Sequence, residues 1–119
     1  MDIPNHMHDG SIESLPEHNR LERIKKHIAE NLSSDLSLGM VADIFKISSS
    51  SLRYIFNKYQ HESYQQYVEG VRMKKAYELL TKDEMIIKEV MSVTGYKIRS
   101  TFYRAFIKHF KKPPHHFLQ

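Results

Sequence analysis

Apolar side chains recur with a helical period along most of the chain. Leu21, Ile24, Ile28 and Leu32 fall on one face of a helix that begins near residue 20. Similar spacing marks further helices at about 38–45, 49–59, 63–80, 86–94 and 99–110. No stretch shows a convincing period of two, which a half-buried strand would require. The pattern therefore predicts an all-α domain.

Polar residues at the predicted helix starts support these boundaries. Ser37 is placed to cap the second helix, and Ser48 or Ser49 to cap the third. Residues 63–66 read Ser-Tyr-Gln-Gln, a capping box that opens the long helix. Two prolines at 113–114 predict a short last helix, since proline suits the first helical turn. The expected total is seven helices.

Two stretches of the chain repeat each other. The first carries Leu38, Val41, Ala42 and Ile44 before a turn and Leu52, Phe56 and Lys58 after it; the second carries Ile87, Val90, Met91 and Val93, then Phe102, Phe106 and Lys108. The offset is 49 residues before the turn and 50 after it, so the second turn, where Gly95 occurs, holds one extra residue. A short helix, a turn and a helix with one apolar stripe form a helix-turn-helix. We therefore predict a bipartite domain with two such units.

The outward faces of the second helix in each unit contain no Asp or Glu. They carry Ser50, Ser51, Arg53, Tyr54, Asn57 and Lys58 in the first unit, and Arg99, Ser100, Tyr103, Arg104 and Lys108 in the second. The long helix at 63–80 would span about 27 Å, and successive major-groove segments lie ~34 Å apart. We expect it to hold both acid-free faces in one direction, about one DNA turn apart.

Charge is unevenly distributed along the chain. Residues 1–19 carry a net charge of −4 and no sustained apolar period, and we interpret them as a flexible leader. Residues 20–119 carry +8, of which +6 lies in 97–119, and we interpret them as one DNA-binding domain. Within it we place a first helix-turn-helix at about 37–60, the linker helix at 63–80 and a second helix-turn-helix at about 86–110. A one-sided basic excess suits a polyanionic partner, although a basic surface that serves only solubility has the same composition.

The composition argues against several other classes of protein. The chain has no cysteine, no secretory signal pattern and no apolar run long enough to span a membrane, which fits a cytoplasmic protein. His6, His8 and His18 match no metal-ligand spacing. No catalytic arrangement and no Gly-rich phosphate loop is present. We therefore expect no enzyme activity, cofactor, metal or small-molecule ligand.

Residues 20–119 resemble the DNA-binding domain of the AraC/XylS family of bacterial transcription regulators. The resemblance rests on residues 36–56, 63–80 and 95–117, and it is most specific in Gly95-Tyr96, Thr101-Phe102-Tyr103-Arg104-Ala105-Phe106, Lys108, Pro114 and Phe117. It implies promoter binding, usually with activation through contact with RNA polymerase. His61, Met91 and Lys111 stand where the family usually has Gly, Ala and Gly. Family members usually carry an effector-sensing domain, so this chain is either a fragment or a stand-alone member.

The resemblance also implies roles for single residues. Base contacts are expected from Ser50, Arg53, Tyr54, Arg99, Ser100, Tyr103 and Arg104, and phosphate contacts from Lys58, Lys97 and Lys108. Arginine can pair with guanine through two hydrogen bonds, whereas the alternative for both Arg53 and Arg104 is a surface ion pair or a phosphate contact. Arg99, at the start of its helix, could contact either a base or a phosphate. The alternative for the two tyrosines is half-buried packing. We expect Arg72 to be structural, fastening the long helix through hydrogen bonds.

Double-stranded DNA is thus the expected partner of a sequence-specific transcription regulator. The rival is a helical protein-interaction module, such as an anti-regulator on the same fold. Exposed apolar anchors would favour that rival, because interface hot spots are commonly large apolar or aromatic side chains. The basic outward faces favour DNA.

Overall fold

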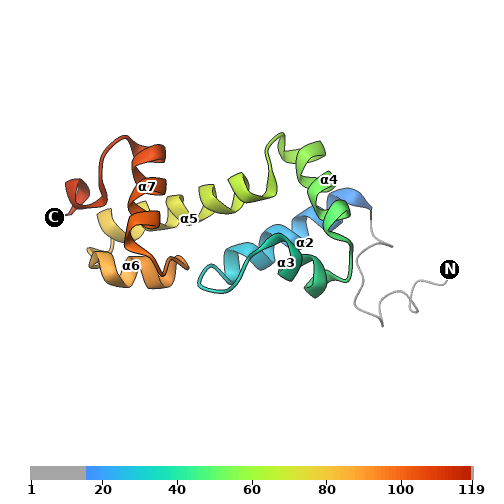
Figure 1. Ribbon diagram of the computed structural model, residues 1–119, viewed down its shortest axis with the longest axis horizontal. Coiled ribbons are helices and arrows are strands. Elements are labelled where there is room, and N and C mark those ends of the chain that lie inside the picture. Colours follow the sequence, from blue (N-terminus) through green and yellow to red (C-terminus); the bar gives the residue numbers. More distant parts are fainter. Residues whose placement is uncertain (1–15, 119) are drawn as a thin grey trace. The chain divides into compact units, whose positions relative to one another are not determined.

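A computed structural model describes residues 16–118 of the chain, and within them every regular element is helical (Figure 1). The elements are α2 (Glu17–Glu30), α3 (Leu38–Phe45), α4 (Ser49–Gln60), α5 (Tyr64–Thr81), α6 (Ile87–Val93), α7 (Arg99–Phe110) and the 3-10 helix η1 (Pro114–Phe117). The predicted all-α class is confirmed, and the predicted short last helix is the 3-10 turn. None of the described helices is long and apolar enough to cross a lipid bilayer.

The first helix begins earlier than the apolar pattern indicated. Its start is Glu17 rather than a residue near 20, so three residues assigned to the predicted leader are helical. Pro16 stands at the N-cap and offers no side-chain capping bond, which removes the polar signal that marked other helices. The rest of the leader, with His6 and His8, lies outside the described residues.

The described chain divides into two compact units. The first unit consists of residues 16–31 and 36–67, and the second of residues 32–35 and 68–118. Helix α5 begins in the first unit and continues through the second. The short segment 32–35, which follows α2 in sequence, packs with the second unit.

The core of the first unit is built by α2, α3 and α4, with α4 packed against both of the others. Phe56 of α4 is fully buried, and its ring lies 5.2 Å from that of Tyr64 and 5.1 Å from that of Tyr67. The Tyr64 hydroxyl donates a hydrogen bond to the Leu36 carbonyl at 2.8 Å. The remaining buried apolar side chains are Leu21, Ile24, Ile28, Leu36, Val41, Ala42, Ile47, Leu52 and Ile55.

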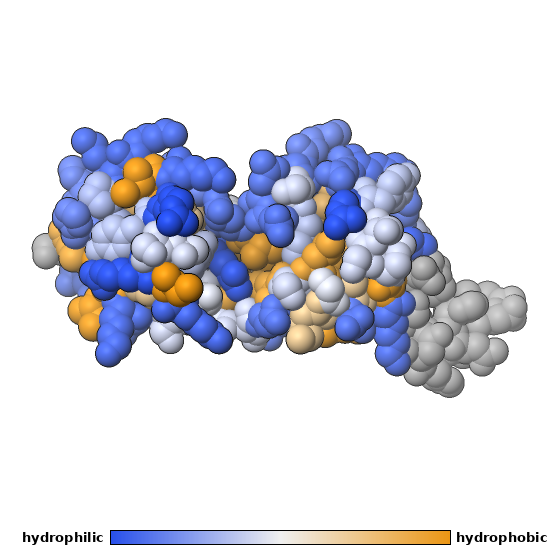
Figure 2. Space-filling model, in the orientation of Figure 1, coloured by the Kyte–Doolittle hydropathy of each residue, from blue (hydrophilic) through white to orange (hydrophobic). Residues whose placement is uncertain are grey.

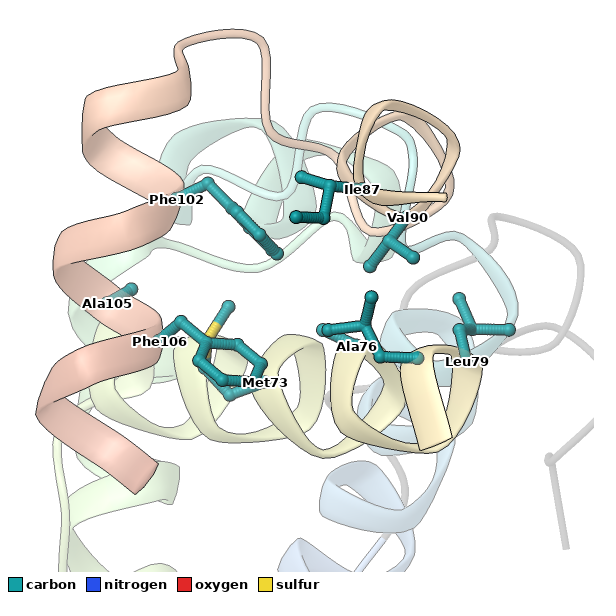
Figure 3. Packing of buried hydrophobic residues seen from close by; sticks show 9 residues of the cluster. Met73, Ala76, Leu79, Ile87, Val90, Phe102, Ala105 and Phe106 are labelled. Atoms are coloured by element: carbon teal, nitrogen blue, oxygen red, sulfur yellow. The ribbon is translucent and has the colours of Figure 1, made fainter. Parts of the chain in front are cut away.

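The core of the second unit gathers side chains from α5, α6 and α7 (Figure 3). Phe102 and Phe106 project from α7 toward Ile87 of α6 and Met73 of α5. The ring of Phe117 in η1 lies 5.7 Å from that of Phe106, so the 3-10 turn covers this end of the core. Burying large aromatic side chains supplies most of the driving force for such a small unit.

Helix starts follow the local polar residues named from the sequence. Ser48 caps α4, since its hydroxyl accepts a hydrogen bond from the Ser51 backbone N–H at 3.0 Å. The capping box is confirmed: Ser63 accepts from the Gln66 N–H at 3.0 Å, and the Gln66 side chain accepts from the Ser63 N–H at 2.9 Å. Ser37 stands at the N-cap of α3 with extended backbone angles, but its side chain makes no capping hydrogen bond, so that part of the prediction is wrong.

Candidate nucleic-acid interface

Both helix-turn-helix turns begin with the same backbone closure. At the end of α3, the N–H groups of Lys46 and Ile47 bond to the carbonyls of Asp43 and Ala42. At the end of α6, those of Gly95 and Tyr96 bond to Ser92 and Met91. This is the Schellman arrangement, in which the residue just beyond the helix end adopts the left-handed conformation. The two turns thus share this hydrogen-bond pattern, although none of the residues that form it is identical between them.

Superposing the two closures identifies the extra residue of the second turn. Lys46, with φ of 57°, corresponds to Gly95, with φ of 86°. The N-cap of α4 is Ser48 and that of α7 is Ile98. One residue separates the left-handed residue from the N-cap in the first turn, whereas two residues separate them in the second. The added residue of the second turn is therefore Lys97 and not Gly95.

Gly95 is also required by a close backbone approach. A Cβ at this position would overlap the Leu32 carbonyl oxygen and lie 2.8 Å from a guanidinium nitrogen of Arg72. That nitrogen donates hydrogen bonds to the carbonyls of Leu32 at 3.1 Å and Ser34 at 3.0 Å. The predicted structural role of Arg72 is confirmed, because it fastens segment 32–35 to α5 inside the second unit.

The outward face of α4 presents the residues predicted to read bases in the first unit. Ser50, Arg53 and Tyr54 are exposed, and 53% of Tyr54 is accessible. The opposite side of the helix is buried through Leu52 and Phe56. The helix therefore offers one polar, acid-free side to solvent. A reading helix, the second helix of a helix-turn-helix that enters the DNA groove, requires such a side.

The outward face of α7 is similar but carries more charge. Arg99, Ser100 and Arg104 are exposed, whereas Tyr103 is half-buried. The Arg99 guanidinium donates to the Tyr103 hydroxyl at 3.1 Å and stacks over its ring at 5.1 Å. The structure brings these two predicted site residues together, and the packing alternative for Tyr103 holds at least in part.

The three lysines predicted to contact phosphates have different surroundings. Lys58 pairs with Glu17 at 2.7 Å, and Lys108 pairs with Glu69 at 3.1 Å. Lys97, by contrast, is exposed and forms no ion pair within residues 16–118. Lys58 and Lys108 would have to give up an ion pair to contact a phosphate, whereas Lys97 would not.

Sequence reasoning missed the two carboxylates that hold these lysines. The Glu17 carboxylate also accepts from the Tyr59 hydroxyl at 2.7 Å, and the hydrogen bond from Lys58 is the largest cause that lowers its pKa. The Glu69 carboxylate also contacts His109 at 2.8 Å. Burial raises the pKa of Glu69, but hydrogen bonds from His109 and Lys108 outweigh it, so the net pKa is lowered.

A signal for these carboxylates exists in the sequence. An offset of 52 residues relates α2 to α5: Leu21, Ile24 and Ile28 of α2 correspond to Met73, Ala76 and Leu80 of α5, and all six are buried. The same offset relates Glu17 to Glu69. The repeat thus includes a supporting helix ahead of each helix-turn-helix, and extending it backwards would have located both carboxylates.

The accessible surface is mostly hydrophilic on the face drawn in Figure 2, with hydrophobic patches between the polar side chains. One exposed apolar residue lies next to the proposed reading surface. Ile98, the N-cap residue of α7, is 61% accessible and directly precedes Arg99. It offers a branched apolar group at the start of a reading helix.

Comparison with known proteins identifies the relatives of this architecture. A family model described as "Helix-turn-helix domain" matches residues 41–119. The chain is 36% identical over 78 residues to the uncharacterized HTH-type transcriptional regulator YfiF of Bacillus subtilis, a match covering 66% of this chain and 25% of that protein. It is 29% identical over 97 residues to the transcriptional activator AggR of Escherichia coli, covering 82% and 36%. The chain thus spans about a quarter to a third of the length of these relatives.

A solved structure agrees in fold as well as in sequence. The C-terminal domain of AraT, a response regulator from Geobacillus stearothermophilus, superposes with a TM-score of 0.77 at 29% identity. The match covers 81% of this chain and 80% of that one. Together with the double helix-turn-helix and its linker helix, these findings show that the chain belongs to the AraC/XylS family of helix-turn-helix transcription regulators.

Proposed function

We propose that this chain binds double-stranded DNA as the reading part of a transcription regulator, with α4 and α7 in neighbouring major-groove segments. The observation that carries the proposal is the pair of exposed, acid-free outward faces, one on the second helix of each helix-turn-helix. Such a helix enters the major groove, which is wide enough to admit it. The family of the chain supports the same partner.

The exposed side chains suit direct reading of base edges. Arg53 and Arg104 have the planar fork that pairs with guanine O6 and N7. Ser50 and Ser100 are short enough to let the helix backbone approach the groove. Ile98 adds an apolar contact of the kind that recognises a thymine methyl group. We assign base recognition to these residues, with Tyr54 beside Arg53 in the first unit and the Arg99–Tyr103 pair in the second.

The length of α5 supports two half-sites about one helical turn apart. Its 18 residues span about 27 Å at ~1.5 Å per residue. One turn of B-DNA advances ~34 Å, so the helix and its end turns suffice to serve both segments. A single chain would then read what many helix-turn-helix proteins read as dimers.

Activation of transcription is a further part of this proposal. AggR, to which the chain is similar, is described as a transcriptional activator. We propose that the chain takes part in activation at promoters, with RNA polymerase as a second partner.

Arginine substitutions test the proposal. We expect Arg53→Ala and Arg104→Ala each to relax base preference in one half-site, by about 1–3 kcal/mol of discrimination. Arg23→Ala removes the same charge from an exposed position on α2 and serves as the control. Binding to mutated half-sites, measured for each variant, is the readout. A uniform loss on all sequences would make the two arginines phosphate contacts, and no loss would reject the reading faces.

A further inference from the structure

A hollow of about 570 Å³ lies in the second unit, beside the start of α7. Its lining comes from three segments: Ser33 from segment 32–35, Lys88, Met91 and Ser92 from α6, and Gly95, Tyr96, Lys97 and Arg99 from the turn and α7. Three of these residues are cations and none is acidic. We propose that this hollow is a phosphate-binding site for one DNA backbone phosphate, held by Lys88 and Lys97 beside the charge of Arg99.

The charges of the hollow are available to a ligand. Lys88 and Lys97 are exposed and form no ion pair with any described residue. Arg99 donates a hydrogen bond to the Tyr103 hydroxyl and forms no ion pair among residues 16–118. Lys58 and Lys108 differ, because each is already neutralised by a glutamate. An anion therefore gains most from the three cations around this hollow.

The rigid floor of the hollow depends on Gly95 and Arg72. Gly95 brings the turn against segment 32–35, and Arg72 bonds to two carbonyls of that segment. Tyr96 lies over the Arg72 guanidinium at 5.8 Å and against Phe102 at 5.3 Å. These contacts fix the backbone of the turn from which Lys97 projects, so binding need order only the lysine side chains and not the turn itself.

The position of the hollow favours the DNA backbone as the source of the phosphate. In a helix-turn-helix the first helix crosses the backbone while the second enters the groove. Lys88 lies on the first of these helices, and Arg99 begins the second. The proposal rests on the proposed DNA-binding function and adds Lys88, which neither the repeat nor the family resemblance indicated. The first unit has no counterpart, because Lys88 corresponds to the uncharged Gly39 of α3 at the offset of 49, and Lys97 is the added residue of the second turn.

Salt-dependent binding of the whole chain to a duplex tests the site. Each phosphate neutralised by the protein contributes about −0.9 to the slope of log K against log salt. We expect Lys88→Gln and Lys97→Gln each to weaken binding several-fold at low salt and to make that slope shallower. Lys74→Gln removes the same charge from an exposed position on α5 outside the hollow and should leave the slope unchanged. Equal behaviour of Lys88→Gln and Lys74→Gln would overturn the proposal.

Failure of the site and failure of the function give different results. If the unaltered chain shows no salt-dependent binding to any duplex, the proposed function fails and the site with it. If the unaltered chain binds and Lys88→Gln matches the control, only the phosphate site fails. All three lysines are exposed, and melting curves of the variants will show whether the fold is unchanged.

Inorganic phosphate distinguishes the DNA backbone from a free phosphorylated ligand. We expect amide resonances around Lys88 and Lys97 to shift on addition of stoichiometric duplex, and inorganic phosphate at constant ionic strength to produce only weak, unsaturated shifts. Saturable binding of phosphate alone, with no response of these resonances to duplex, would assign the hollow to a free ligand and contradict the proposal.

Discussion

The two helix-turn-helix units share a supporting framework and differ in the turn. Each has a supporting helix with three buried apolar residues and a fully buried phenylalanine, Phe56 or Phe106, in its second helix. The lysine two positions after that phenylalanine pairs with a glutamate of the supporting helix. Each reading helix also ends at a left-handed residue, His61 or Lys111. The repeat thus retains what orients the reading helix.

The difference lies in the residues between the two helices. The first unit closes α3 with Lys46 and caps α4 with Ser48. The second closes α6 with Gly95, adds Lys97 and begins α7 without a side-chain cap. Gly95 and the added Lys97 both line the basic hollow of the second unit. Positive charge is therefore added at the turn of the second unit without a change in the core that supports α7.

The largest expected effect tests the shared core. Phe56→Ala and Phe106→Ala should each destabilise the fold by about 3–5 kcal/mol, because a fully buried ring leaves a cavity. Denaturant unfolding measures the loss. An unchanged unfolding midpoint for either variant would place that ring outside the core and end the equivalence of the two units.

The next largest effect tests the difference between the turns. Gly95→Ala should cost about 2–3 kcal/mol, because the left-handed backbone and the Leu32 carbonyl both oppose a Cβ. Gly70→Ala is the control: this glycine lies within α5 with no other atom close to an added Cβ, and the change should stabilise by up to ~1 kcal/mol. Thermal melting of both variants gives the comparison, and equal effects would refute the special role of Gly95.

Substitution by glycine at the left-handed residues should raise stability, whereas the loss of Gly95 should lower it. Lys46→Gly, His61→Gly and Lys111→Gly should each stabilise by about 0.5–1 kcal/mol, because glycine adopts these angles without steric cost. Lys112→Gly, next to Lys111 but not left-handed, should bring no gain. A loss of stability at all three positions would show that the side chains contribute more than the backbone conformation costs.

The smallest expected effect is electrostatic. The pKa values of Glu17 and Glu69 are lowered below their ordinary 4.5 in the folded state, so their pairing stabilises above about that pH and is lost on further acidification. Glu17→Gln and Glu69→Gln should slightly lower stability at neutral pH and flatten its decline below pH 4.5. Both groups are accessible to solvent, which keeps the effect small. Unfolding curves at several pH values measure it, and an unaltered acid profile would argue against both pairs.

Local signals account for the parts of the fold that the sequence predicted well. Ser48 and the Ser63–Gln66 box mark their helix starts because the capping groups are near in sequence. Glu17 was assigned to a leader because its partners lie some 40 residues away. Lys46 gave no sign of a left-handed turn, since lysine does not favour that conformation. The outward faces followed from periodicity, but the hollow depends on three segments that only the fold brings together.

Selection of bound sequences from a random duplex library shows whether the chain recognises two neighbouring groove segments. We expect enrichment of two short motifs whose centres lie about 10 base pairs apart, one turn of the double helix. Arg53→Ala should weaken base preference in one motif and Arg104→Ala in the other. A single motif, a variable spacing between two motifs, or no enrichment at all would contradict a protein that reads two neighbouring groove segments with α4 and α7.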